Sequence, residues 1–546
     1  MPDPAQQVRD WLATYDTPTA SVAELLCDRH PRDRVALTDV GADLAARDVT
    51  YGELADRSAA LAAGMAAEGV RAGDDVATMV ARGADLAVAA LATWRLGAVH
   101  VPLLTTFAPS AIAHRLTPGT RLVVADDDQR AKLDPGPDLP EGSVSRVVTT
   151  GEAPLREGDR TLAGLAAAGA GAPVTAAAVG GGSPFVLMHT VGSAGPAKGV
   201  PVPVRALAAF HAYHRFGLDV TGDDVYWNTS DPSGAYGLYH GLISPLLAGH
   251  RTLHLDAGFD PELVLDVLAI HGVTNLAAAP TVYRSLRAIL KTLPPEIAVR
   301  RLSSAGEPLG ADVLEWARDV FGVPVRDHYG QTELGMCVGR PNDPAAAAEG
   351  AEGAEPGPDS LGTALPGWRA GVLEAVADEE APPGAFGRIG VDTEHSPLMW
   401  FTGYRDAPAA TSARFTPDGR WYLTGDAGTR DRAGNLYFAS RDDDAILSAG
   451  YRIGPFDVES ALLEHPAVEE AAVYGLPDEV HGQLVAATVV LGEGAVGDDD
   501  LAEDLREIVR TRFASHAYPR HITFAEELPR SPSGKIRRSR LGARRV

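Results

Sequence analysis

The sequence predicts an α/β protein with a large N-terminal domain of layered α/β subdomains and a small α+β domain at its C-terminal end. Helix-like and strand-like segments alternate through most of the chain, a pattern typical of sheets with largely parallel strands. The length of 546 residues exceeds the usual size of a single hydrophobic core. Beyond about residue 443 the pattern changes to short strands and two helices, so we expect domains at 1–442 and 443–546.

The individual elements follow from periodicity and from glycine positions. The segment "ADLAVAALATWRLGAVHVPLL" from Ala84 predicts an amphipathic helix, a stop at Gly97 and a buried strand. The segment "LVLDVLAIHGVTNLAAAPTVYRSL" from Leu263 repeats this order around Gly272. Strands are predicted at "SPFVLMHT" and "VPVRDH", and helices at "VRALAAFHAYHRF", "DVESALLEH" and "DDDLAEDLREIVRTRF".

Two stretches interrupt this alternation. They are "LAGLAAAGAGAPVTAAAVGGG" before residue 183 and "PNDPAAAAEGAEGAEPGPDS" from Pro341. We expect flexible linkers or surface insertions, most clearly for the second stretch, which has no apolar periodicity.

Composition excludes several classes of function. The net charge of -25 disfavours nucleic acid and anionic membranes as partners, so an anionic ligand must be captured locally. No window has the apolar length of a membrane span, and the start lacks the residue order of a signal peptide, so we expect a cytoplasmic protein. Cys27 and Cys337 are too few for a disulfide framework or a structural zinc site.

A glycine-rich loop, "TVGSAGPAKG", lies between a predicted strand and a predicted helix. This arrangement presents backbone N–H groups and the ammonium of Lys198 to phosphate oxygens. Ala197 before the lysine and Gly199 after it break the spacing of a P-loop. The loop alone is equally consistent with a tight turn.

Four further segments carry residues suited to a nucleotide. "DHYGQTEL" offers an aromatic ring, a hydroxyl and a carboxylate, which suit a base, a phosphate and a magnesium ion. "WYLTGDAG" places a carboxylate on a turn, where it can accept both hydroxyls of a ribose. "SRDDDAILSAGYRIGPFDVE" and "PRSPSGKIRRSRL" add arginines, a glycine turn and a lysine. Each segment taken singly also fits a solvated turn, a helix cap or a basic tail.

In this order the segments resemble the adenylate-forming superfamily of acyl-CoA synthetases, adenylation domains and luciferases. The resemblance runs from about Thr50 to Lys535. "DVYWNTSDPSGAYGLYHGLISPLLAG" and "SAGEPLG" are most similar to the acetyl-CoA and medium-chain acyl-CoA synthetase branch. The resemblance implies an acyl-CoA ligase that uses ATP, Mg²⁺ and coenzyme A. It first forms acyl-AMP and pyrophosphate; then a mobile C-terminal domain moves, and the thiol of coenzyme A takes the acyl group and displaces AMP.

The resemblance also implies roles for individual residues. The glycine-rich loop and the segment "DHYGQTEL" would bind phosphates and magnesium. Separate residues would bind adenine and ribose, and residues near and within the C-terminal domain would serve as the hinge, the adenylation lysine and the lining of the coenzyme A tunnel. The assigned residues are Ser193 and Lys198 for phosphate; Thr332 and Glu333 for phosphate and Mg²⁺; Gly306, Glu307 and Tyr329 for adenine; Asp426 and Arg441 for ribose; Arg452 as a further cofactor-binding residue; Asp443 as the hinge; Lys535 as the lysine of adenylation; and Gly450 beside the pantetheine tunnel.

The loop departs from the family pattern T-S-G-T-T-G-x-P-K-G. Val191 and Ala194 stand where hydroxyl residues bond the β- and γ-phosphates. Each lost hydrogen bond to a charged group costs roughly 1.5–3 kcal/mol. We therefore expect impaired adenylation, with a separate adenylating ligase supplying acyl-AMP. The alternative is a complete two-step synthetase, in which Lys198, Ser193 and backbone amides suffice; Lys535 favours this alternative.

A second departure concerns the acyl pocket, assigned to Ser233, Gly234 and Tyr236. The related branch has glycine-tryptophan where this chain has Ser233 and Gly234. Loss of the indole enlarges the pocket, so we expect a bulky hydrophobic acid, unless Trp227, Tyr236 or Tyr239 refills the space.

Two further functions are open. The protein could transfer its acyl group to a carrier protein or an amine, or it could be a non-catalytic homologue. The excess of alanine, glycine and arginine over lysine is typical of proteins from GC-rich bacterial genomes, and an unusual ligase with an enlarged pocket would suit natural product biosynthesis.

Overall fold

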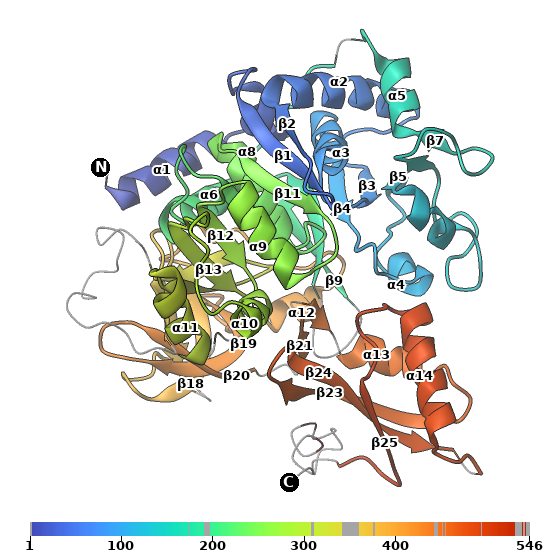
Figure 1. Ribbon diagram of the computed structural model, residues 1–546, viewed down its shortest axis with the longest axis vertical. Helices are drawn as coiled ribbons and strands as arrows, with labels where there is room; N and C mark the ends of the chain where they lie inside the picture. Colours follow the sequence, from blue (N-terminus) through green and yellow to red (C-terminus); the bar gives the residue numbers. More distant parts are fainter. Residues whose placement is uncertain are drawn as a thin grey trace.

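The computed structural model of the 546-residue chain describes two packed regions. It describes residues 3–172, 174–190, 197–306, 309, 311–340, 360–374, 377–441, 446–449, 451–453, 455–492, 494–529, 538 and 541. The expected mixed α/β architecture is confirmed: a large N-terminal region of two big sheets lies above a smaller C-terminal region in Figure 1.

The first sheet has seven strands in the order β7-β6-β5-β3-β4-β8-β9. Its pairs are parallel except β8 with β9. The strands are β3 (Asp75–Met79), β4 (Val99–Pro102), β5 (Thr120–Ala125), β6 (Val147–Thr149), β7 (Arg160–Thr161), β8 (Pro184–Thr190) and β9 (Lys198–Pro203). The associated helices are α2 (Tyr51–Ala67), α3 (Ala84–Arg95), α4 (Pro109–Ala113), η2 (Asp127–Leu133) and α5 (Leu162–Gly169). The predicted helix from Ala84 is confirmed as α3, and Gly97 follows it with φ 69°.

The prediction of a linker before residue 183 is wrong over its first half. Residues Leu162–Gly169 form helix α5, which packs against α2. A Cβ built on Gly169 of α5 would lie 2.1 Å from the carbonyl oxygen of Ala60 in α2, and one built on Gly64 of α2 would lie 2.2 Å from the carbonyl oxygen of Leu165. The small residues that suggest a linker therefore allow two helix backbones to approach closely. The second alanine-rich stretch, 341–359, lies outside the described residues.

The second sheet has thirteen strands, in the order β17-β18-β19-β20-β16-β15-β14-β13-β12-β10-β11-β1-β2. Strands β1, β11, β10, β12, β13 and β14 form a parallel centre. The strands are β1 (Val35–Gly41), β2 (Ala46–Thr50), β10 (Tyr226–Asn228), β11 (Thr252–Asp256), β12 (Asn275–Ala278), β13 (Arg301–Ala305), β14 (Val325–Gln331), β15 (Gly335–Gly339), β16 (Ser360–Ala364), β17 (Ala370–Leu373), β18 (Phe386–Asp392), β19 (Trp421–Arg430) and β20 (Leu436–Arg441).

The helices of this region are short, and several contain π-helical turns. They are α1 (Pro4–Tyr15), η1 (Glu24–Asp28), η3 (Val204–Ala206), α6 (Leu207–Ala212), η4 (Tyr213–Gly217), α7 (Ala235–Gly237), η5 (Leu238–Ile243), α8 (Ser244–Ala248), α9 (Pro261–Ile270), α10 (Pro280–Ile289), α11 (Ala311–Phe321) and α12 (Pro408–Ser412). The predicted repeat is confirmed by α9, Gly272 at φ 61° and β12. Wide π-helical turns at η4 and η5 often accompany functional sites.

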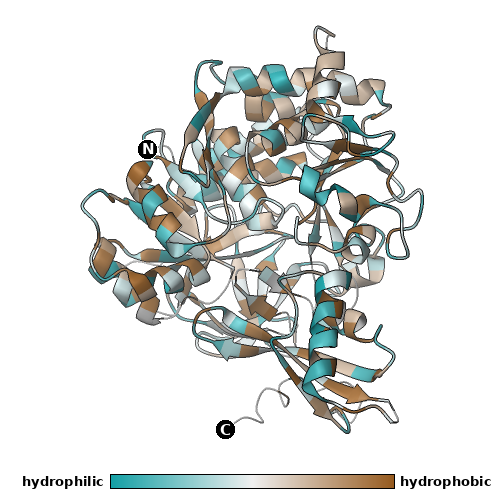
Figure 2. Cartoon of the chain, turned by 45° about the vertical axis from the view of Figure 1, so that its right-hand side comes forward, coloured by the Kyte–Doolittle hydropathy of each residue, from teal (hydrophilic) through white to brown (hydrophobic). Residues whose placement is uncertain are grey.

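The C-terminal region is built on a five-stranded sheet with two helices. Its strands run β22-β21-β24-β23, with β25 paired to β24. The elements are β21 (Ile446–Ser448), β22 (Tyr451–Ile453), α13 (Pro455–Leu462), β23 (Val468–Asp478), β24 (Gly482–Leu491), α14 (Asp499–Arg512) and β25 (His521–Ala525). Figure 2 shows hydrophobic residues concentrated on strands and inner helix faces. The described helices include none that combines the length and apolar character of a bilayer span.

Candidate active site

The principal cavity lies between the two regions and has a volume of about 1690 Å³. Its N-terminal walls come from the carboxyl ends of the central parallel strands, including Ala279 after β12, Gly306 after β13 and Tyr329 near the end of β14. Ligands of open α/β sheets bind at this edge of the sheet. The C-terminal region closes the other side with residues of β21, β22 and the β23–β24 turn.

A buried carboxylate anchors one end of this cavity. Asp426 Oδ2 accepts hydrogen bonds from Tyr329 OH at 2.5 Å and from Gln331 Nε2 at 3.0 Å. Asp426 is 3% exposed and pairs in register with Arg441 on the neighbouring strand. Burial, and next the negative charge of Asp426, raise the pKa of Tyr329, so its hydroxyl stays a donor. This corner holds a fixed acceptor beside an aromatic ring, as a nucleoside needs.

Replacing Asp426 by asparagine tests this anchor. The amide keeps the shape but removes the charge, and its NH₂ group faces two donors. Loss of a charge-assisted hydrogen bond predicts a rise of about 10- to 100-fold in the Kd for AMP. Titration calorimetry with AMP measures this change. An unchanged Kd contradicts a role for Asp426 in holding the ribose.

The wall beside Tyr329 combines a bare backbone with a second carboxyl group. Gly306 has φ 97°, a conformation that favours glycine, and a Cβ built there would meet no atom within 4 Å. Asp327 lies two residues before Tyr329 on β14, and both line the cavity. Burial raises the pKa of Asp327 to about 7. The sequence analysis missed Asp327, although the two-residue period of a strand places it on the same face as Tyr329.

A cluster of charged and hydroxyl groups forms the corner assigned to phosphates. Glu333 is 3% exposed, and its Oε1 accepts from Tyr404 OH at 2.6 Å. Arg414 Nε donates to Tyr404 OH at 3.1 Å. Lys198 Nζ lies 5.4 Å from the centroid of the Tyr404 ring. Thr332 lines the cavity, and its carbonyl accepts from Tyr239 OH at 3.2 Å.

This corner fits the requirements of Mg²⁺. Magnesium is usually held by one or two carboxylates together with substrate phosphates and water. Glu333 supplies one carboxylate and bonds the hydroxyl of Tyr404, and the ammonium of Lys198 lies over the ring of the same tyrosine. Tyr404 and Arg414 were missed by the sequence analysis, because nothing local to them indicates that they meet Glu333.

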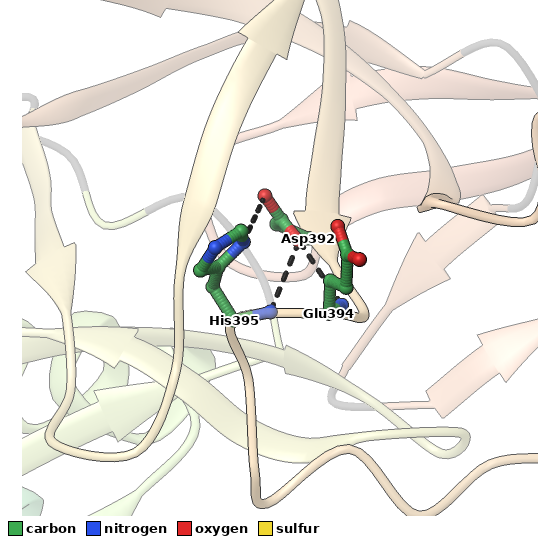
Figure 3. A group of neighbouring side chains, drawn as sticks. All are labelled: Asp392, Glu394 and His395. Carbon is green, nitrogen blue, oxygen red and sulfur yellow. Dashed lines mark hydrogen bonds and ion pairs between the residues drawn. The ribbon is translucent and has the colours of Figure 1, made fainter.

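Figure 3 shows another group with the residue types of a metal site. Asp392, Glu394 and His395 are the metal-like cluster found among the residues that the structure describes. Asp392 Oδ2 already bonds His395 Nδ1 at 3.0 Å and pairs with Arg369 and Arg420. Its Oδ1 accepts from the backbone N–H groups of Glu394 and His395. Two arginines on the carboxylate disfavour a cation, so we assign this cluster to turn stabilisation.

The residues assigned to the acyl pocket lie at the start of α7. Gly234 has ordinary negative φ, and a Cβ built there would approach only the carbonyl oxygen of Asp231, at 3.4 Å. Ser233, Gly234 and Tyr236 line the cavity. Tyr236 OH lies 3.0 Å from Tyr213 OH, which lies 2.8 Å from His328 Nδ1. The pocket therefore has open space at Gly234 and a fixed phenol nearby.

Trp227 belongs to the hydrophobic core. It is 1% exposed, in the cluster formed with Leu253 and Leu276, its register partners on β11 and β12. Tyr236 and Tyr239 line the cavity. Trp227 therefore does not fill the space of the missing indole, whereas Tyr236 and Tyr239 are placed where they could.

A hairpin of the C-terminal region reaches the cavity. Leu447, Ala449 and Tyr451, from β21, β22 and the turn between them, line it, and the Tyr451 ring stacks on His516 with centroids 3.9 Å apart. The region is held there by the backbone bond from Ala108 N to Phe513 O at 2.6 Å. An ion pair between Arg512 and Asp138 adds to this contact.

Several predicted residues have no described side chain. Arg441 and Arg452 lie in β20 and β22, and nothing is described of their side chains. Outside the described residues altogether are Ser193, Glu307, Asp443, Gly450 and Lys535. The roles assigned to all these residues stay predictions.

Comparisons with known proteins match almost the whole chain. The family described as AMP-binding enzyme matches residues 24–404, and the AMP-binding enzyme C-terminal domain matches residues 457–535. The acetyl-coenzyme A synthetase of Bacillus subtilis is 30% identical over 491 residues, which are 87% of this chain and 81% of that protein. The human mitochondrial acyl-coenzyme A synthetase ACSM3 is 38% identical over 332 residues, 60% of this chain and about half (54%) of that protein.

Solved structures are similar to this protein over almost its whole length. An acyl-CoA synthetase from Brucella canis is 40% identical, with a TM-score of 0.71, covering 98% of this chain and 96% of that one. The amide bond synthetase McbA from Marinactinospora thermotolerans is 26% identical, with a TM-score of 0.79, covering 95% and 99%.

Proposed function

Since this chain belongs to the AMP-binding enzyme family and is an acyl-CoA ligase, we propose that it makes the coenzyme A thioester of a bulky hydrophobic carboxylic acid. The reaction passes through an acyl-adenylate. We propose further that the chain is specialised for the second half-reaction, in which acyl-AMP and coenzyme A give acyl-CoA and AMP.

Asp426 and Tyr329 orient the AMP part of the intermediate. The carboxylate accepts the ribose hydroxyls while Tyr329 and Gln331, both on β14, hold it in place. The ring of Tyr329 covers one face of adenine, and the bare backbone at Gly306 leaves room for the base. Fixing both reactants removes much of the entropic barrier to acyl transfer, so no dedicated general base is needed.

Adenylation, where it occurs, uses the corner around Glu333. Bound Mg²⁺ would neutralise phosphate charge there, with Glu333 and Thr332 as its protein partners. By the resemblance, Lys535 offsets the charge that develops when the carboxylate approaches the α-phosphate, and Lys198 binds phosphate. Tyr404 orients the Glu333 carboxylate by donating to its Oε1, and Arg414 holds Tyr404 by donating to its hydroxyl oxygen.

The observation that carries the proposal is the position of the β21–β22 hairpin. Leu447, Ala449 and Tyr451 line the same cavity as Tyr329 and Asp426. This is the placement that the family resemblance implies for thioesterification, with Gly450 beside the path of the pantetheine thiol. The backbone bond at Phe513 and the Arg512–Asp138 ion pair favour this arrangement of the two regions.

The substrate class rests on the space at Gly234. Trp227 lies in the hydrophobic core, so it does not fill the space that the indole occupies in the related branch. The freed volume suits a polycyclic or terpenoid acid better than acetate, as expected for natural product biosynthesis.

The variant Gly234→Trp tests the substrate class. Its Cβ fits without a backbone clash, because the nearest atom lies at 3.4 Å. We expect kcat/KM for a bulky acyl-AMP such as 2-naphthoyl-AMP to fall about 100-fold, while that for acetyl-AMP is unchanged or rises. Gly234→Ala is the matched control and should alter neither. Equal losses for both acyl groups would contradict a pocket at Gly234.

The second candidate is a complete two-step synthetase. Lys198 lies over the ring of Tyr404, whose hydroxyl donates to Glu333, and this grouping of a cation with a carboxylate supports retained handling of phosphates. If the chain is instead specialised for the second half-reaction, a separate adenylating ligase supplies acyl-AMP.

One experiment tests the ligase activity itself. Purified protein is incubated with coenzyme A and a panel of synthetic acyl-AMPs, from acetyl to polycyclic, and acyl-CoA is detected by mass spectrometry. We expect thioester from the bulky acyl-AMPs. The absence of acyl-CoA from every acyl-AMP would favour a non-catalytic homologue that binds acyl-nucleotide.

A further inference from the structure

A buried histidine beside the acyl pocket has one ring nitrogen with no hydrogen-bond partner. His240 lies in η5, four residues after Tyr236, and both residues line the cavity. The four-residue spacing places them on one face of a helix, with ring centroids 5.5 Å apart. Among the residues that the structure describes, none bonds His240 Nε2. A buried polar atom left in this state destabilises the protein, and a ligand that pairs with it removes this cost.

The other ring nitrogen fixes the tautomer of His240. Nδ1 lies 3.2 Å from Ser244 Oγ, whose single proton is donated to the carbonyl oxygen of Tyr239 at 2.6 Å. Because this proton is already used, Oγ accepts from Nδ1–H. Burial lowers the pKa of His240 to about 3, so the imidazole is neutral and carries no second N–H. Nε2 is therefore an acceptor, and a ligand that pairs with it must bring a hydrogen-bond donor.

The hydroxyl of Tyr236 adds a second polar group to this wall. It lies 3.0 Å from Tyr213 OH, which lies 2.8 Å from His328 Nδ1, so a chain of hydrogen bonds holds the phenol in place. Burial raises the pKa of Tyr236 to about 12, and the hydroxyl stays protonated. Tyr213 and Ser303 take at most two of the three hydrogen-bonding positions of this hydroxyl. One position is left for a ligand.

Aromatic packing makes His240 rigid. Its ring meets the rings of Phe210, Tyr213 and Tyr239 edge to face. The imidazole is thus held by these contacts as well as by Ser244. A rigid polar group in an aromatic wall discriminates strongly between ligands, because an analogue that lacks the matching group leaves it unpaired.

We propose that the acyl pocket recognises a hydroxyl group of the substrate, which donates to His240 Nε2 and bonds the hydroxyl of Tyr236. The substrate class is then a bulky acid whose apolar skeleton carries a hydroxyl, rather than a plain hydrocarbon acid. This inference rests on the proposed function and deepens it. The open space at Gly234 gives room for the skeleton, and the polar wall begins two residues later. An acid without the hydroxyl leaves Nε2 buried and unpaired, so the site disfavours it.

Titration calorimetry with unreactive analogues of acyl-AMP tests the inference separately from catalysis. The probes are acyl sulfamates of adenosine, made from 2-naphthoic acid and from each of its monohydroxy isomers. For the wild-type chain we expect the Kd of at least one hydroxy isomer to be about 10-fold or more below that of the parent.

The variants His240→Phe and His240→Asn should abolish this preference. The first keeps the ring volume, and the second keeps a polar group for Ser244 while removing Nε2. In both, the Kd values of parent and hydroxy isomer should agree within about twofold, because the isomer loses its partner and the parent does not. Tyr236→Phe should lower the preference about threefold.

The matched control is His100→Phe. His100 is equally buried, has one ring nitrogen without a partner among the described residues, and is not part of the cavity wall. This variant should keep the full preference. Equal affinity of the wild-type chain for the parent and every hydroxy isomer, or an unchanged preference in both His240 variants, would overturn the inference and leave the ligase function standing. A retained preference without acyl-CoA from any reactive acyl-AMP would support the inference about the pocket and overturn the proposed function.

Discussion

The double variant Val191→Ser/Ala194→Thr is expected to form acyl-adenylate from ATP about 10²- to 10⁴-fold faster than the wild-type chain. Each substitution returns a hydroxyl that the family pattern places against the β- and γ-phosphates. A hydrogen bond to a charged group is worth roughly 1.5–3 kcal/mol, and a factor of ten corresponds to about 1.4 kcal/mol. Isotope exchange between ATP and pyrophosphate measures the gain.

The second half-reaction serves as the control for this variant. Thioester formation from acyl-AMP and coenzyme A does not involve the β- and γ-phosphates, so its rate should stay within about twofold of wild type. Single variants should each give part of the gain. An exchange rate unchanged in the double variant would show that Val191 and Ala194 do not limit adenylation.

Acidification is expected to unfold the protein cooperatively between about pH 6 and pH 5. Burial lowers the pKa of eight histidines, five to about 3 and three to about 4: His100, His189, His211, His240 and His328, and His30, His254 and His516. In the unfolded chain these imidazoles bind protons below about pH 6.5, while the folded chain keeps them neutral. Their contribution to stability is therefore present above pH 6.5 and lost as the pH falls.

Each such histidine removes up to about 1.4 kcal/mol of unfolding free energy per pH unit. Eight together exceed a typical folding free energy of about 5–15 kcal/mol within one or two units. Burial also raises the pKa of three carboxyl groups, Asp39, Asp126 and Asp327, the last to about 7; these act in the opposite direction but are fewer than the histidines. Urea unfolding at a series of pH values should show about five or more protons taken up on unfolding near pH 5.5. An acid transition below pH 4 would contradict this account.

Local sequence signals sufficed for the helices that end in glycine. Gly97 and Gly272 take positive φ after α3 and α9, as their positions in the sequence predict. Packing between distant helices was not visible in the same way. The stretch containing α5 has the composition of a linker, yet Gly64 and Gly169 are small because the two helix backbones nearly touch.

In the candidate site, too, some residues could be predicted from the sequence, whereas contacts between distant segments could not. Tyr329 and Asp426, which the family resemblance assigns to one nucleotide, are joined by a hydrogen bond of 2.5 Å. Tyr404 and Glu333 are 71 residues apart in the sequence, and nothing near either residue predicts their contact. Gln331 was missed for a similar reason, since its partners Thr424 and Asp426 lie on β19.

The most direct test of specialisation compares the two half-reactions on one purified sample with one bulky acid. Rapid mixing gives the single-turnover rate of acyl-AMP formation from acid and Mg-ATP, and the rate of thioester formation from the same acyl-AMP and coenzyme A. We predict that thioester formation is at least about 100-fold faster, the loss expected from two missing hydrogen bonds to phosphate. Equal rates, or faster adenylation, would contradict specialisation and establish a complete two-step synthetase.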